Sequence, residues 1–142
     1  MDVIYSFLCD YADNTTGKLH ALGIGIDTVY AQTLPARHRH LFAVIALRFS
    51  RVEAGEKRLS LHVVDADGAD ILPSVDTALN VGPPPPGYAY RVERAALGMY
   101  NVGFAKYGDY SFRWVVNGTE AASIPLKVVP PPGLASSEGG KA

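Results

Sequence analysis

Three carboxylates surround a glycine in the segment VVDADGADIL, residues 63–72, and they are the first candidates for chemistry in this chain. Asp65, Asp67 and Asp70 could contribute to a calcium site, which takes roughly six to eight oxygen ligands from carboxylates and carbonyls. Three carboxylates fall short of that number, and no flanking helices are predicted. The pair Asp67 and Gly68 is instead a strong signal for a tight turn between two strands. The segment therefore predicts a β-hairpin.

Two histidines lie two residues apart in the segment ARHRH, residues 36–40. On a strand, His38 and His40 would share one face, as two ligands of a zinc site could. Zinc needs a third and usually a fourth ligand, and His20 and His62 fall on other predicted strands. A solvated basic loop that leads into a strand explains the same residues. His38 and His40 are the candidate ligands of an alternative function, a small-ligand or metal-binding protein.

Cys9 stands next to Asp10, a pair that could suggest a nucleophile beside a carboxylate. A reactive thiolate needs a basic partner or a helix N-terminus, and a strand of alternating apolar residues supplies neither. Cys9 is therefore predicted to be a small buried hydrophobe. The segment GIGID lies inside a predicted strand and is no phosphate-binding loop. We expect no catalytic residue, no cofactor and no enzymatic activity.

Five of the eight tyrosines follow the proline-rich segment GPPPPG, and the first four of them are candidates for recognition. Tyr88, Tyr90, Tyr100 and Tyr107 could form a recognition surface for a carbohydrate or a peptide, because a tyrosine combines an apolar ring with a polar tip. The alternative is that tyrosines are simply enriched in strands. These four residues are the candidate recognition surface.

Composition limits the classes of protein that fit this chain. Its 142 residues correspond to one ordinary domain, and 48% hydrophobic with 19% charged residues is a globular composition. Thirteen basic and fourteen acidic side chains give a net charge of −1, so no basic face for nucleic acid or an anionic membrane is expected. The N-terminal segment lacks the features of a signal peptide, and the single cysteine requires no oxidising compartment. We expect a cytoplasmic protein.

Alternation of apolar residues predicts strands along most of the chain. Segments 3–10, 18–31, 40–50, 59–65, 88–102, 109–116 and 120–129 carry the pattern, and Pro73 suggests that the weaker strand over 71–81 lies at a sheet edge. Seven to eight short strands without a convincing helix predict an all-β fold, an antiparallel β-sandwich over residues 1–129. Residues 130–142, rich in Pro, Gly and Ser, are predicted to be a disordered tail.

The segment NVGFAKYGDYSF makes the prediction more specific. In immunoglobulin-like domains a tyrosine near the start of the penultimate strand bonds back to the backbone a few residues upstream. Tyr110 is in the place of that tyrosine, and Phe112 is in the place of the disulfide cysteine of antibody domains. We therefore predict an immunoglobulin-like sandwich that packing alone stabilises.

The last hairpin has a pattern sharp enough to predict a register. The row that contains Phe112 must face the row that contains Ala122, because directly opposed residues point to the same side of a sheet. A three-residue loop over 116–118 satisfies this requirement and puts Phe112 opposite Ala122. A loop over 117–119 keeps the same faces and shifts each partner by two residues. We expect the first, since it places glycine where a positive φ is needed.

Three segments together are similar to a known family. VIYSFLCDYA, GKLHALGIGIDTVYA and YGDYSFRWVVNGTEAASIPLKVV resemble an uncharacterised bacterial family of about this length, a domain of unknown function. The resemblance covers most of residues 3–129 and implies a stand-alone β-sandwich, without catalytic or binding residues to carry over. The most consistent function is a non-enzymatic binding or scaffold module. Its expected partner is another protein or a second copy of itself, bound through an edge strand.

Overall fold

The computed structural model describes residues 1–133, and strands make up most of them. The ten strands and one short 3-10 helix are β1 (Asp2–Cys9), β2 (Tyr11–Asp13), β3 (His20–Leu22), β4 (Thr28–Tyr30), β5 (Ala36–Ser50), η1 (Arg51–Glu53), β6 (Gly55–Val64), β7 (Val75–Val81), β8 (Tyr90–Phe104), β9 (Gly108–Val116) and β10 (Thr119–Val129). The predicted all-β class is confirmed. The predicted number of seven to eight strands is too low. Of the predicted tail, residues 134–142 lie outside the described residues.

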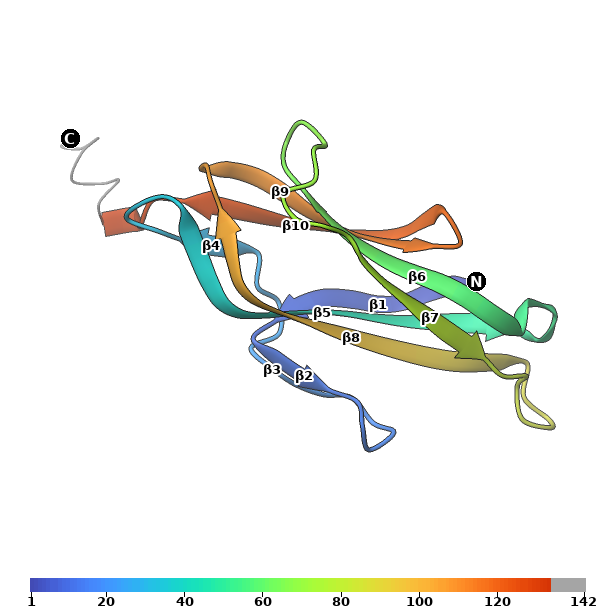
Figure 1. Cartoon of the computed structure of the whole chain (residues 1–142). Helices are drawn as coiled ribbons and strands as arrows, with labels where there is room; N and C mark the ends of the chain where they lie inside the picture. The colour runs from blue at the N-terminus through green and yellow to red at the C-terminus, as the bar shows by residue number, and fades with distance from the viewer. Residues whose placement is uncertain (134–142) are drawn as a thin grey trace.

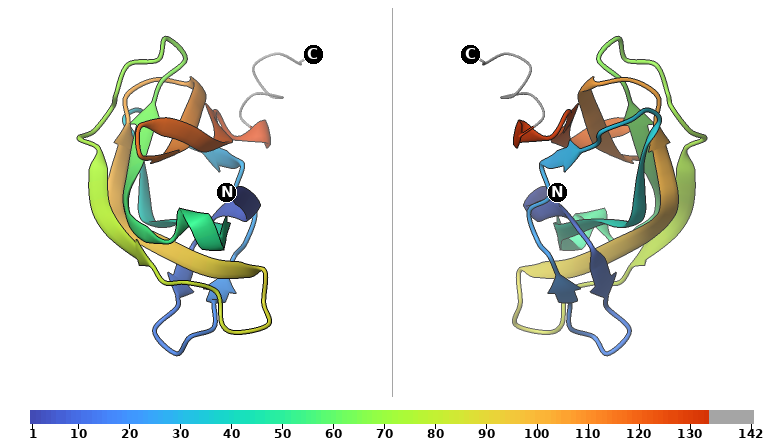
Figure 2. Two further views of the ribbon diagram at one scale, coloured as in Figure 1. Left: turned by 90° about the vertical axis from the view of Figure 1, so that its right-hand side faces the viewer. Right: turned by 90° about the vertical axis from the view of Figure 1, so that its left-hand side faces the viewer.

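The strands form two main sheets and a small hairpin (Figure 1). One sheet has the order β1-β5-β8, and the other has the order β4-β10-β9-β6-β7. All neighbours are antiparallel except β4 and β10, which are parallel. The β2–β3 hairpin is separate from both sheets. Seen from the ends, the strands curve around a common core as a half-barrel (Figure 2).

The core lies between the two sheets because each long strand alternates its apolar side chains. Leu59, Leu61 and Val63 of β6 face inwards, as do Phe112 and Trp114 of β9, and all five are fully buried. The strand β5 is apolar on both faces over its central residues. Its Leu41, Ala43, Ile45 and Leu47 belong to the main core, whereas Phe42 and Val44 form a second, smaller cluster on the opposite side.

The segment 18–31 is not one strand as predicted. Gly23 and Gly25 adopt φ values of 68° and 93°, a left-handed conformation that breaks the ladder. A side chain at Gly23 would also collide with the carboxylate of Asp10. The segment therefore divides into β3, which pairs with β2, and β4, which joins the other sheet beside β10. The carboxylate of Asp10 thus approaches Gly23 closely at the point where β3 ends.

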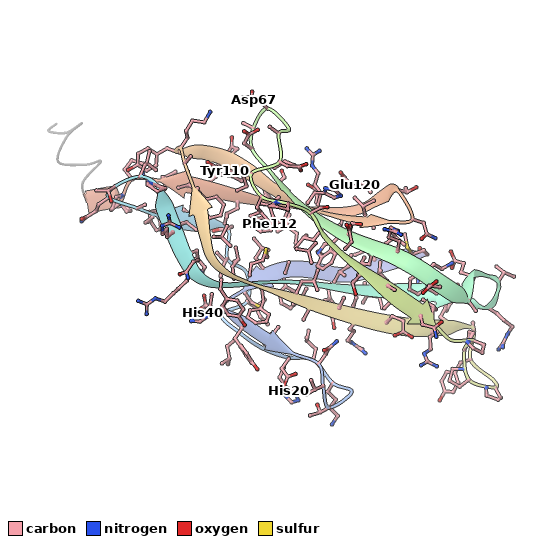
Figure 3. The ribbon with its side chains drawn as sticks, in the orientation of Figure 1. His20, His40, Asp67, Tyr110, Phe112 and Glu120 are labelled. Atoms are coloured by element: carbon pink, nitrogen blue, oxygen red, sulfur yellow. The ribbon has the colours of Figure 1, made fainter. Side chains whose placement is uncertain are left out.

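The predicted tyrosine corner is confirmed. Tyr110 is almost fully buried at the start of β9, and Figure 3 labels it there. Its hydroxyl donates to the carbonyl of Lys106 at 2.7 Å and accepts the amide of the same residue at 3.3 Å. One side chain thus satisfies both backbone groups of a residue in the β8–β9 connection.

Removal of that hydroxyl should weaken the fold measurably. We expect Tyr110→Phe to lower the free energy of unfolding by about 1 kcal/mol, the net contribution of an intramolecular hydrogen bond. Urea unfolding followed by far-UV circular dichroism measures the change. Tyr88→Phe is the matched control, because Tyr88 is two-thirds exposed and should tolerate the same change without loss. Equal stability of Tyr110→Phe and the wild type would count against a structural role for the hydroxyl.

The predicted three-residue loop of the last hairpin is wrong, although the side chains of β9 and β10 lie on the predicted faces of the sheet. Asn117 and Gly118 form a two-residue turn with φ values of 49° and 84°, and Val116 pairs with Thr119. A two-residue turn alone would place Trp114 opposite a residue of the wrong face. A bulge between Glu120 and Ala122 inserts one residue and restores the faces, so that Trp114 pairs with Ala122.

Candidate functional site

His38 and His40 both lie on β5 and line one open hollow with Asp10, Tyr11 and Arg39. The hollow has a volume of about 430 Å³. The Nε2 atom of His38 is 3.6 Å from a carboxylate oxygen of Asp10, so the two form an ion pair when the imidazole is protonated. Alternate residues of one strand thus bring both imidazoles to the same hollow.

The other two histidines lie elsewhere. His20 contacts the hydroxyl of Thr16 at 3.2 Å on the β2–β3 hairpin, and Figure 3 shows it well apart from His40. His62 lies 3.8 Å from Asp70 on the five-stranded sheet. Within residues 1–133, no group of three or more histidine, cysteine, aspartate or glutamate side chains is arranged to hold a metal ion.

An aromatic cluster lies beside the hollow, and we call Tyr11, His40, Phe42 and Tyr100 the outer aromatic cluster. The ring of Tyr100 meets His40 edge-on with centroids 5.4 Å apart, and it meets Phe42 at 6.1 Å. Tyr11 packs edge-on against Phe42 at 5.2 Å. Phe42 is buried, whereas 61% of Tyr100 and 49% of Tyr11 remain exposed. The rings of Tyr11 and Tyr100 are thus exposed to solvent while both pack on the buried ring of Phe42.

Of the four candidate tyrosines, the structure brings only Tyr100 into this cluster. Tyr90 lies at the other end of β8, roughly 33 Å away along an extended strand, where its ring contacts the guanidinium of Arg48 at 4.5 Å. Tyr88 precedes it in the exposed β7–β8 loop. Tyr107 donates its hydroxyl to the carbonyl of Ala31 at 2.8 Å.

Sequence reasoning missed Tyr11 and Phe42 as members of the cluster. The outward position of Phe42 could have been read from β5, where apolar residues fill both alternating rows. Tyr11 joins the cluster because β2 folds back over the outer face of the β1-β5-β8 sheet. Ala12 of β2 packs there with Phe42 and Val44. That fold-back depends on the position of a neighbouring hairpin and leaves no signal in the local sequence.

β8 forms one edge of the three-stranded sheet, and the direction of its backbone groups follows from its neighbours. The carbonyl of Leu8 in β1 accepts the amides of Gly25 and Ile26 at 2.9 and 3.1 Å, so it points away from β5. Two directly opposed residues of antiparallel strands either both direct their backbone N–H and C=O groups at each other, or both direct them away. Leu8 and Ala43 are such a pair, so Ala43 directs its backbone groups away from β1 and towards β8. Leu97 of β8 pairs with Ala43, and its backbone N–H and C=O groups therefore form hydrogen bonds with β5.

The residues that alternate with Leu97 direct their N–H and C=O groups away from the sheet. Arg94, Ala96, Gly98 and Tyr100 belong to this set. An independent contact agrees, since the side-chain amide of Asn14 donates to the carbonyl of Arg94 at 3.1 Å from outside the sheet. No backbone group in the described part of the chain pairs with this side of β8. A 15-residue strand thus offers an open edge next to the outer aromatic cluster.

The segment with three aspartates forms the predicted turn between β6 and β7, and Figure 3 labels Asp67 at its tip. One carboxylate oxygen of Asp65 accepts the amides of Asp67 and Ala69 at 2.9 and 3.0 Å. Gly68 has a φ of 83°, which a tight turn requires. Asp65 therefore stabilises the loop backbone, and the hairpin prediction is confirmed.

Cys9 is fully buried, as predicted, and its thiol lies 3.4 Å from the carbonyl of Tyr11. Burial raises the pKa of the Cys9 thiol; the hydrogen bond to Tyr11 acts in the opposite direction, and the charge of Asp10 raises it further. Both the inaccessibility and the raised pKa disfavour a nucleophilic role.

Thiol labelling should therefore be slow in the native protein. We expect Cys9 to react with an aromatic disulfide reagent at pH 8 at least about a hundredfold more slowly in buffer than in 6 M guanidinium chloride, because reaction requires opening of the structure. Val52→Cys places a second thiol at a fully exposed position and should add one fast-reacting group. Fast labelling of the wild-type protein in buffer would contradict the buried position.

The fold and the site define an all-β protein of two facing sheets, with an open sheet edge beside an exposed aromatic cluster. The chain belongs to DUF6941, a family of unknown function, whose family model matches residues 4–129. A search of curated proteins finds no match to this chain. None of the helical segments within residues 1–133 is long and apolar enough to cross a membrane.

Proposed function

We propose that this chain is a non-enzymatic binding or scaffold module of the bacterial cytoplasm, with an immunoglobulin-like fold, that binds an extended protein segment along the open edge of β8. The single observation that carries the proposal is the 15-residue edge strand with outward-facing backbone groups next to exposed aromatic rings. Strand addition of this kind draws affinity from main-chain hydrogen bonds and specificity from side-chain contacts.

The strand order supports the immunoglobulin-like assignment. Constant-type immunoglobulin domains have sheets A-B-E-D and G-F-C. Here β1, β5 and β8 correspond to A, B and E, while β10, β9 and β6 correspond to G, F and C, with β7 in the place of an added C′ strand. The buried tyrosine at the start of β9 is in the position of the tyrosine corner.

The same correspondence explains why β8 has an open edge. In the constant-type domain, strand D covers the free side of strand E. In this chain, β7 leads through the segment GPPPPG directly to β8, and no strand within residues 1–133 takes the place of D. Open edges invite pairing, and proteins protect them with charges, prolines or bulges where pairing is unwanted. From Ala95 to Phe104, β8 has no charged residue and no proline.

Photo-crosslinking tests the proposal. A photoreactive phenylalanine derivative in place of Tyr100 should crosslink in the source cells to one protein that mass spectrometry identifies, either another chain or the same one. The same derivative in place of Val52 should give no such product, because Val52 is 93% exposed on η1, next to the Tyr90 end of β8 and far from Tyr100. Absence of any specific product at position 100 would overturn the proposal.

A second candidate is a small-ligand or metal-binding protein that uses His38 and His40. The observation in its favour is the hollow that both histidines line with Asp10. Elemental analysis of the purified protein is the test. Zinc, nickel or copper in stoichiometric amount, lost in His38→Ala but kept in the control His62→Ala, would favour this function over the first.

A further inference from the structure

We infer that the segment bound to the β8 edge is the β8 strand of a second copy of this chain, paired antiparallel about a two-fold axis at Leu97. The inference rests on the proposed function, since it names the partner of the same edge. A two-fold axis makes the same surface of both copies meet itself, so each contact occurs twice. The β8 edge must then be complementary to the β8 edge of a second copy that runs in the opposite direction.

The length and the backbone pattern of β8 satisfy this condition. β8 extends from Tyr90 to Phe104, and its central residue is Leu97. A two-fold axis there superposes the strand on its reversed copy, with regular pairing from Arg94 to Tyr100. Ala96 then lies opposite Gly98 of the second copy, and both direct their N–H and C=O groups outwards. Each such pair can exchange two hydrogen bonds, as in a regular antiparallel ladder.

The side chains also match in this register. Arg94 lies opposite Tyr100 of the second copy, on the outer face of the combined sheet, and both side chains are exposed. The Nε atom of Arg94 donates to the hydroxyl of Tyr5 at 3.0 Å across β5. The aliphatic stem of Arg94, and not its guanidinium, therefore lies beside the ring of Tyr100 of the second copy. Glu93 lies opposite Asn101, so no like charges are directly opposed.

Charge separation favours Leu97 over Ala95 as the centre. With the axis at Leu97, the two copies of Arg94 are separated by six residues, or about 20 Å along the strand. With the axis at Ala95, they would be separated by only two residues, and two guanidinium groups on one face would repel each other. The pairing ends after Tyr100, because Asn101 has a φ of 55° and interrupts the regular strand.

One existing contact lies in the path of the second copy. Asn14 donates to the carbonyl of Arg94. A carbonyl oxygen has two lone pairs, so it can accept the amide of Tyr100 of the second copy while it keeps the bond to Asn14. The β2–β3 hairpin otherwise packs on the outer face of the sheet, against residues that include Phe42, Val44 and Ala96.

The mass of the purified wild-type protein in solution is the first test. Sedimentation velocity from 1 to 200 µM should show a concentration-dependent dimer. Arg94→Pro should raise the dissociation constant at least tenfold, because it removes an outward N–H that β5 does not use and the contact with Tyr100. Tyr5→Phe is the matched control. It removes the 3.0 Å hydrogen bond between Tyr5 and Arg94 but keeps the edge, and should dimerise as the wild type does.

Engineered disulfides test the register. Leu97→Cys should form a covalent dimer under mild oxidation, because a residue on the axis faces itself at a distance that a disulfide can bridge. Ala95→Cys is the control on the same face of the same strand, and it should stay monomeric on a non-reducing gel. Cys9 is buried and should not contribute. A covalent dimer with Ala95→Cys, or with neither variant, would overturn this register.

The outcomes separate the inference from the proposed function. A wild-type protein that stays monomeric at 200 µM overturns the second copy as the partner. If Tyr100 then crosslinks to a different protein in cells, the binding function of the edge stands with another partner. If the protein is monomeric and Tyr100 gives no specific crosslink, both proposals fail.

Discussion

Trp114→Ala is expected to lower the free energy of unfolding by about 4 kcal/mol, the typical cost of deleting a large aromatic side chain from a core. Trp114 is fully buried on β9 at the centre of the main core, between the two sheets. Alanine would leave a cavity that the surrounding strands cannot close without breaking their hydrogen bonds. Small domains are stable by only about 5–15 kcal/mol, so this loss is a large part of the total.

Trp114→Phe is the matched control for this substitution. The indole nitrogen of Trp114 is buried and has no hydrogen-bond partner among the described residues. Phenylalanine keeps most of the aromatic volume and removes an unpaired donor whose burial is unfavourable. We expect it to lose less than half as much stability as alanine. Both variants lack the single tryptophan, so far-UV circular dichroism in urea is the measurement. Equal losses would show that packing at this site does not depend on ring volume.

Gly98→Ala is expected to destabilise the protein by about 2 kcal/mol, the usual range for overpacking a filled site. A Cβ atom at Gly98 would lie 2.7 Å from two ring atoms of Phe42, well inside normal contact. Phe42 is held by Tyr11 on one side and Tyr100 on the other. The ring must shift, and the outer aromatic cluster must shift with it.

Gly103→Ala is the matched control on the same strand. A Cβ atom at Gly103 would meet only the mobile end of the Arg37 side chain, at 3.5 Å. The change should be neutral or stabilise slightly, because alanine reduces the freedom of the unfolded chain. Thermal unfolding of both variants measures the difference. A Gly98→Ala variant as stable as Gly103→Ala would contradict tight packing beneath the outer aromatic cluster.

Local sequence patterns predicted the parts of the structure that depend on neighbouring residues. The alternation in β9 predicted its buried row, and the glycine turn before Tyr110 predicted the tyrosine corner. Asp67 and Gly68 predicted the hairpin between β6 and β7. These features follow from backbone preferences and from the two-residue repeat of a strand, which a short segment contains in full.

Features that depend on distant segments were predicted less well. The last hairpin has a two-residue turn, and a bulge after Glu120 corrects its faces. Sequence spacing cannot distinguish a three-residue loop from a shorter loop followed by a bulge, because both restore the same alternation. The division of segment 18–31 also depends on where Asp10 and β10 lie.

The sequence by itself determined the all-β class, the burial of Cys9 and the candidate pair His38 and His40. Only the tertiary structure decided that Tyr100, and not Tyr88 or Tyr90, joins Tyr11 and Phe42 in one cluster. It also decided that β8 is an edge strand. The physical reason is that an edge is defined by the absence of a neighbouring strand, and each strand sequence encodes its faces but not which strands pair with it.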